Sequence, residues 1–238
     1  MSAIRREWRI QRYNLLPLLA LVAGGFVLGR LFALVIGLIS HESGWIPLGV
    51  IFAGFGLIAV FFSLSMQFTL GLNHAILMSR TRKAFLIGNY PIGALTLLLG
   101  MALTLLLGWL EYITAPAADP QLLDLFGRIA AVVLHPLFLI GFPVGGIIIA
   151  DFVGALAARF GGRALWVLWG LWMLFAVVFP RLIDASAGRD TLFTRAIHAL
   201  GTLFGRLSLA MLSAIGLLFL AAALIATIKI TSQKRAEA

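Results

Sequence analysis

The residues of this chain that could do chemistry are few, and their spacing fits none of the common nucleotide-binding motifs. A phosphate-binding loop needs Gly-Lys followed by Ser or Thr, so that backbone N–H groups and one Lys hold the phosphates. The Lys residues instead follow Arg82, Ile228 and Gln233. We therefore expect no ATPase centre in this chain.

Catalytic and metal-binding patterns are equally weak. The four His residues form no HExxH motif and lie far apart, and the absence of Cys removes disulfides, thiolate chemistry and Cys-based metal sites. A Ser–His pair with His135 stays open, but no GxSxG motif accompanies it, so packing or capping is the favoured role of the serines. The candidate serines are Ser63, Ser65, Ser208 and Ser213. The sequence predicts no enzyme, cofactor site or metal site.

Two charged residues, Arg30 and Asp151, interrupt long apolar segments, where a charge is costly. For Arg30, the alternatives are extension toward the outer headgroups and a place in a substrate path. For Asp151, a bond to a neighbouring helix or to the inner basic loops is favoured over proton or substrate handling. Their different depths argue against a direct pair.

The composition places these residues in a membrane. The 238 residues are 62% hydrophobic and only 11% charged, with a mean hydropathy of +1.07, whereas about a quarter of an average soluble domain is charged. A net charge of +9 is compatible with nucleic acid. Because this charge lies beside apolar segments, anionic lipids are the expected partner instead, and we expect no nucleic-acid partner.

The apolar segments predict an all-α, polytopic integral membrane protein in a single domain, residues 1–238. About 20 apolar residues cross the hydrocarbon of a bilayer as a helix. The run 43–79 is too long for one crossing and too short for two, so we expect its helix to continue beyond the membrane. An interfacial helix is expected at 3–13. The six predicted transmembrane helices are 14–39, 46–72, 91–113, 127–157, 163–180 and 204–230.

Charge alternates between the two sides of these predicted spans. Most Lys and Arg residues lie at the N-terminus, in the second and fourth connections and in the tail, whereas the other connections hold most acids. Since positively charged connections stay in the cytoplasm, both termini are predicted to be cytoplasmic. No cleavable signal is evident. The outer connections include a polar one at 112–124 and a longer one at 181–203 with a short surface helix.

Small residues and prolines predict how the helices pack. Gly25/Gly29, Gly141/Gly145 and Gly201/Gly205 are GxxxG pairs, which allow helix backbones to approach closely. We favour packing within the chain over a dimer interface for each pair. Pro136 and Pro143 are expected to break or kink the fourth span.

The second connection, 71–90, alternates apolar and polar residues, which favours a short helix–turn element at the inner membrane surface. Met78 and Phe85 are expected to be exposed there, where they could dock into another protein. On composition alone, a solvated loop that touches lipid is the simpler interpretation.

This connection also resembles a known family. The stretch Ser79-Arg80-Thr81-Arg82-Lys83-Ala84-Phe85 resembles the interior loop of small six-span permeases of bacterial ATP-binding cassette (ABC) exporters, and Arg159-Phe160-Gly161-Gly162-Arg163 is similar to their turn between spans four and five. The Arg-rich start is similar to their interfacial helix. The resemblance is to permeases of the antimicrobial-peptide-immunity type, and it extends over nearly the whole chain by topology.

The resemblance implies a permease subunit in the bacterial cell (inner) membrane that exports a peptide, a lipid or another amphipathic substrate. It implies a second permease, identical or homologous, and separate cytoplasmic ATPase subunits that carry ATP and Mg. The loop 71–90 would be the coupling element. The implied ATPase contacts are Met78, Ser79, Arg80, Thr81, Arg82, Lys83, Phe85, Arg159 and Arg163.

Three alternatives remain open. The chain could be a motor-independent secondary transporter or channel that uses Arg30 and Asp151. It could be a ligand-binding membrane subunit, including the capture component of a vitamin importer. An intramembrane enzyme is the least favoured class. The sequence itself identifies neither the substrate nor its direction of movement.

Overall fold

The chain is a multi-pass, all-α membrane protein. A computed structural model describes residues 3–40, 47–77, 81–114, 127–128, 130–178, 181 and 209–233. Five of its helices are long and apolar enough to cross a membrane. These five candidate spans are Gln11–Ile39, Leu48–Ala75, Arg82–Ile113, Pro136–Phe160 and Ser213–Ser232.

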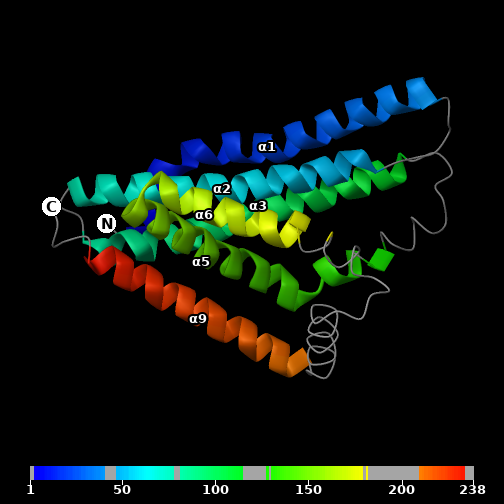
Figure 1. Cartoon of the computed structure of the whole chain (residues 1–238). Helices are drawn as coiled ribbons and strands as arrows, with labels where there is room; N and C mark the ends of the chain where they lie inside the picture. The colour runs from blue at the N-terminus through cyan, green and yellow to red at the C-terminus, as the bar shows by residue number, and fades with distance from the viewer. Residues whose placement is uncertain are drawn as a thin grey trace, which may run out of the picture. The chain divides into compact units, whose positions relative to one another are not determined.

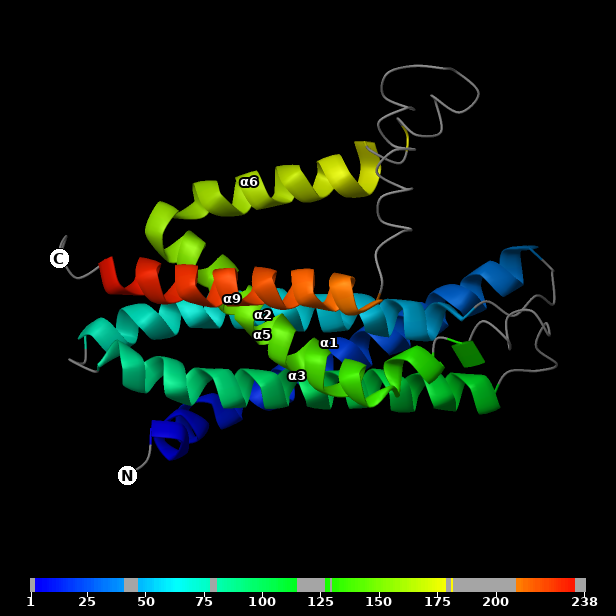
Figure 2. The ribbon, with the colours of Figure 1, turned by 90° about the horizontal axis from the view of Figure 1, so that it is seen from below.

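The chain divides into two compact units, Met1–Gly154 and Ala155–Ala238. Unit 1 contains three long helices and most of α5. These are α1 (Ala3–Ser40), α2 (Leu48–Leu77), α3 (Arg82–Ile113) and α5 (Pro136–Phe160), the last of which continues into unit 2. In both views α1, α2 and α3 lie alongside one another (Figures 1 and 2). The core of the unit is formed by apolar side chains of these three helices and of α5.

The first three spans are present, with longer helices than predicted. Residues 3–13 are helical as expected, but they form the first turns of α1 and are not a separate element. The helix of the second span continues past its predicted end at residue 72 to Leu77, whereas its extension beyond the membrane stays a prediction. The third helix begins at Arg82, nine residues before its predicted start, so the expected 71–90 element is mostly the ends of α2 and α3.

Glycine brings α1 and α2 together. A Cβ atom on Gly25 or Gly29 would overlap the backbone carbonyl of Phe52 or Leu48, so only glycine permits this approach. Packing within the chain is therefore confirmed for this GxxxG pair. At Gly141, by contrast, an added Cβ would meet no atom within 4 Å. Gly201 and Gly205 lie outside the described residues.

The fourth predicted span is broken at its first proline, as expected. Residues 130–133 are helical, Leu134 and His135 form a turn and a bend, and α5 starts at Pro136. A proline suits the first helical position because its missing N–H needs no partner there. His135 Nδ1 accepts a hydrogen bond from the Leu137 N–H at 3.4 Å and so caps the new helix. Pro143 lies inside α5, which continues through it.

Unit 2 contains the end of α5, then α6 (Gly162–Met173), the π-helical turn η1 (Leu174–Val178) and α9 (Leu209–Gln233). The predicted turn between spans four and five is present at Gly161, whose φ of 67° favours glycine. The fifth predicted span corresponds to α6 and η1, but its last residues lie outside the described part. The count of six spans and the orientation of the termini therefore stay predictions. The surface helix expected within 181–203 also lies outside the described residues.

Candidate functional site

The expected coupling element is built around the start of α3. Thr81 has extended backbone angles, and its Oγ1 accepts a hydrogen bond from the Ala84 N–H at 3.4 Å, so Thr81 is the N-cap of α3. Arg82 and Lys83 are the first two residues of the helix, and no acidic residue stands in its first turn. Lys83 is exposed, and Arg82 is half-buried. Met78, Ser79 and Arg80 lie outside the described residues.

Phe85 does not form part of an exposed surface, and the expectation that it does is wrong. Its side chain is 1% exposed and packs against Phe68 with 5.5 Å between ring centroids. Its ring also lies against Gly71, where a Cβ would come within 3.0 Å of it. The sequence interpretation treated Phe85 as a loop residue, whereas α3 has already begun and turns this position toward α2.

Arg159 and Arg163, the other expected contact residues, flank the Gly161 turn. Arg159 is exposed in the last turn of α5, and its guanidinium lies 5.4 Å from the centre of the Phe160 ring. Arg163 is exposed in the first turn of α6. Both side chains are accessible for a partner, and a contact with an ATPase stays a prediction.

Asp151 is held by a chain of amide side chains near the start of α3. Its side chain is fully buried, and both carboxylate oxygens accept from Asn89 Nδ2, at 3.0 and 2.9 Å. Asn89 Oδ1 in turn accepts from Gln11 Nε2 at 3.0 Å. The predicted bond to a neighbouring helix is thus present, and this polar chain connects α5, α3 and α1. The adjacent Tyr90 hydroxyl is buried and has no hydrogen-bond partner among the described residues.

Arg30 pairs with Glu111, a residue near the end of the third predicted span. Glu111 lies inside α3 and is fully buried, and its Oε1 is 3.3 Å from Arg30 Nη1. Glu111 is thus close to the far end of α3 from Asn89, about 33 Å away along the helix axis at 1.5 Å per residue. The expectation that Arg30 and Asp151 form no direct pair is confirmed.

Glu111 also caps the N-terminus of α2. Its Oε1 accepts from the Gly49 N–H at 3.1 Å, and its Oε2 accepts from the Val50 N–H at 2.6 Å. Pro47, which precedes the helix, has no side-chain oxygen to cap it. A carboxylate from another helix therefore satisfies the free N–H groups and interacts favourably with the helix dipole.

The signal that could have revealed this site is local. Gly49 stands in the first turn of α2, and a Cβ there would lie 2.8 and 2.9 Å from the two Glu111 oxygens. The pattern to look for is a helix start that has no capping side chain but carries a glycine, together with one acid near the end of a neighbouring span. A single sequence, however, does not specify which acid reaches the start of the helix.

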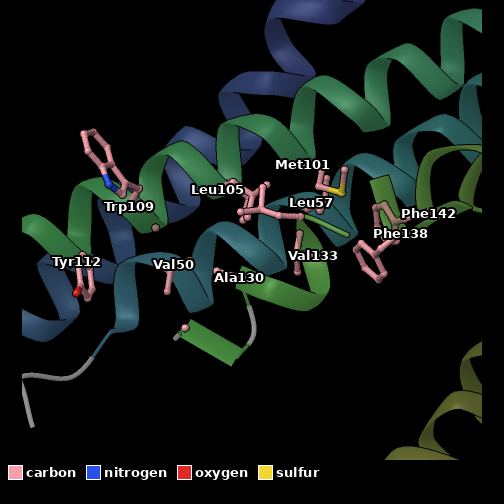
Figure 3. A pocket seen from close by; sticks show the side chains of 14 residues that line it. Val50, Leu57, Met101, Leu105, Trp109, Tyr112, Ala130, Val133, Phe138 and Phe142 are labelled. Atoms are coloured by element: carbon pink, nitrogen blue, oxygen red, sulfur yellow. The ribbon is translucent and has the colours of Figure 1, made fainter. Parts of the chain in front are cut away.

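Unit 1 also contains an apolar pocket of about 600 Å³. It lies between α2, α3 and the segment that leads into α5 (Figure 3). The break at Leu134 and His135 shapes this pocket. The break turns residues 130–133 away from the axis of α5, so that these residues form one wall of the pocket. The pocket is lined by Val50, Leu57, Met101, Thr104, Leu105, Gly108, Trp109, Tyr112, Gly127, Ala130, Val133, Leu134, Phe138 and Phe142.

The polar contacts described above hold the helices of unit 1 together, and the pocket offers an apolar binding surface. Among the described residues, no cluster of His, Asp and Glu could hold a metal ion. No protein-family model, curated protein or solved structure matches the chain. The chain is a multi-pass helical membrane protein, and its structure shows a basic start of α3 and an apolar pocket, both in unit 1.

Proposed function

We propose that the chain is the permease subunit of an ABC exporter in a bacterial cell membrane. Separate cytoplasmic ATPase subunits, which bind ATP and Mg, drive it, and a second permease completes the pathway. Its substrate is a peptide, a lipid or another amphipathic molecule. The proposal rests on the resemblance of the basic connections and on one structural observation at the start of α3.

That observation is the position of Arg82 and Lys83 relative to the helix dipole. The N-terminus of a helix carries a partial positive charge, so basic residues there are unfavourable and acidic residues are favoured. Yet α3 begins with two basic residues and has no acid in its first turn. Neither charge stabilises the helix, and the Lys83 side chain is exposed, which supports a role of Lys83 toward something outside the chain, namely a partner surface or anionic lipid.

The same end of unit 1 carries further basic residues. Gln11 contacts Asn89, which places the start of α1 beside the start of α3, and Arg9 and Arg12 are exposed on that part of α1. A concentration of exposed positive charge at one end of the bundle fits a cytoplasmic face. It also fits a partner with an acidic surface.

The competing hypothesis of a motor-independent transporter receives less support. It requires Arg30 or Asp151 to be available to an ion or substrate. Instead, Arg30 is paired with Glu111, and Asp151 accepts hydrogen bonds from Asn89 while fully buried. Both charges have structural partners on neighbouring helices, so we prefer the permease.

The test is retention of an ATPase by the tagged chain, purified from its native membranes. Lys83→Glu, alone and with Arg82→Glu, is expected to abolish both retention and substrate export. Because an acid at this position favours the helix, unfolding of α3 does not account for such a loss. The matched control is Lys229→Glu, which reverses the charge of one exposed lysine in α9 that is not among the proposed contacts and is expected to retain the ATPase. Equal retention by Lys83→Glu and wild type, or no ATPase with wild type, would contradict the proposal.

A further inference from the structure

The pocket in unit 1 has a lining suited to hydrocarbon. Only three of its lining side chains carry an oxygen or nitrogen atom: Thr104, Trp109 and Tyr112. The Thr104 hydroxyl donates to the Gly100 carbonyl within α3 at 2.9 Å, so its hydrogen is already used. A polar ligand placed here would leave its own groups unpaired, at a large cost in free energy.

The polar atoms of the pocket are concentrated toward one end. Figure 3 shows Tyr112 and Val50 at one end and Met101, Phe138 and Phe142 at the other. Tyr112 is followed by the last residue of α3, Ile113. Trp and Tyr are enriched where a span meets the headgroups of a bilayer. The pocket therefore extends from the membrane interface toward the bilayer centre, over about 16 Å of α3.

We propose that this pocket binds one acyl chain of a membrane phospholipid. The headgroup lies at the level of Trp109 and Tyr112, and the end of the chain reaches Leu57, Met101 and Phe142. The site lies in the half of unit 1 away from Lys83, so with the basic end in the cytoplasm the lipid belongs to the outer leaflet. The inference does not require the ATPase partner.

Three features favour this occupant. Most of the lining belongs to α2, α3 and α5, which are candidate membrane spans, so the expected medium around them is lipid. The volume of about 600 Å³ lies within the range of small-molecule sites. The succession of aromatic polar groups and then purely apolar groups matches a headgroup followed by a chain. Because lipid tails are as apolar as the pocket, affinity comes from packing against its walls and not from the hydrophobic effect.

The test uses the full chain in vesicles of phosphatidylethanolamine and phosphatidylglycerol with a trace of photoreactive phosphatidylcholine. A diazirine at the end of the acyl chain is expected to label Leu57, Met101 and Phe142. A diazirine next to the glycerol is expected to label Trp109 and Tyr112 instead. The reference for ordinary surrounding lipid is Leu106, which is 59% exposed on α3 and does not line the pocket.

A pair of neighbouring variants tests the site directly. Ala130 lines the pocket, whereas Ala131 is exposed and does not. Ala130→Phe fills part of the space and is expected to reduce pocket labelling by about tenfold, which lies within the usual range for overfilling an apolar site. Ala131→Phe is expected to label like wild type.

The depth pattern in wild type tests the proposal even if Ala130→Phe does not fold. Labelling of Met101 no greater than that of Leu106 would overturn it, as would unchanged labelling of a folded Ala130→Phe. Labelling by a photoreactive free fatty acid but not by the phospholipid would overturn the assignment of the ligand. Cross-links from the pocket to another segment of the chain, without lipid, would show that the protein itself fills the space.

Discussion

Replacing Glu111 by Gln removes one charge from unit 1 with almost no change in shape. In the wild type, the two carboxylate oxygens accept hydrogen bonds from the Gly49 and Val50 N–H groups, and one oxygen also pairs with Arg30. A glutamine has one acceptor oxygen and one NH₂ group. In either orientation of the amide, the NH₂ group faces a backbone N–H, so one buried donor loses its partner. We therefore expect a clear loss of stability.

The magnitude follows from two contributions. A buried donor without a partner costs about 1–3 kcal/mol. Loss of the carboxylate charge at a helix N-terminus adds about 0.3–1 kcal/mol, and up to about 2 kcal/mol in partly buried geometry. Because Glu111 is fully buried, little solvent is present to compensate. Glu111→Gln should thus lower the free energy of unfolding by about 2–4 kcal/mol.

Arg30→Gln should lower the free energy of unfolding much less, by about 1 kcal/mol or below. The Arg30 side chain is 39% exposed, and its nitrogen is 3.3 Å from Glu111 Oε1. After its removal the carboxylate still accepts from both N–H groups of α2. The two variants therefore separate the ion pair from the helix cap, and the cap is expected to dominate.

The assay is reversible unfolding by SDS in mixed micelles, followed by tryptophan fluorescence and circular dichroism. Gly49→Ala gives an independent perturbation of the same site, because its Cβ would lie 2.8 Å from Glu111 Oε1 and displace the carboxylate without removing it. The reasoning fails if Glu111→Gln costs no more than Arg30→Gln. It also fails if Gly49→Ala is as stable as the wild type.

Three further outcomes are expected in the same unfolding assay. Gly29→Ala should lower the free energy of unfolding by about 1–3 kcal/mol, because it separates α1 from α2. Gly37→Ala, whose Cβ meets no atom within 4 Å, should be neutral or slightly stabilising. Equal effects of the two variants would contradict the packing argument. Asp151→Asn, which keeps an acceptor for Asn89, should stay within about 1 kcal/mol of wild type, and a larger loss would indicate a role for the charge itself. Phe85→Ala should cost about 3–5 kcal/mol as a buried aromatic residue; a loss below about 1 kcal/mol would fit the exposed position that the sequence suggested.

The apolar segments were predictable because length and hydropathy are properties of each segment alone. The break at Pro136 and the turn at Gly161 were predictable for the same reason, since each follows from the backbone of one residue. The ends of the helices were less predictable. The polar residues before the third predicted span concealed nine further helical residues, because Thr81 caps the helix and Phe85 packs on α2.

The partners of the buried polar groups could not be read from the sequence. Glu111 reaches Gly49 and Arg30, and Asn89 reaches Asp151, across more than sixty positions of the chain. Such pairings depend on which helices are neighbours and on their relative depth. Neither property is encoded in hydropathy, so nothing in the sequence marked Glu111, which is fully buried near the C-terminal end of α3, as the partner of Arg30.

We expect these polar contacts to influence how unit 1 responds to a force at its basic end. Apolar helix faces have no preference for one another over lipid, so glycine contacts and polar bonds must fix the depth of each helix. Asn89 connects α3 to α1 and α5 near one end, and Glu111 connects α3 to α1 and α2 near the other. A helix held near both ends moves as one body. If an ATPase engages Lys83, as we propose, the displacement therefore reaches Met101 and Tyr112, where α3 lines the apolar pocket.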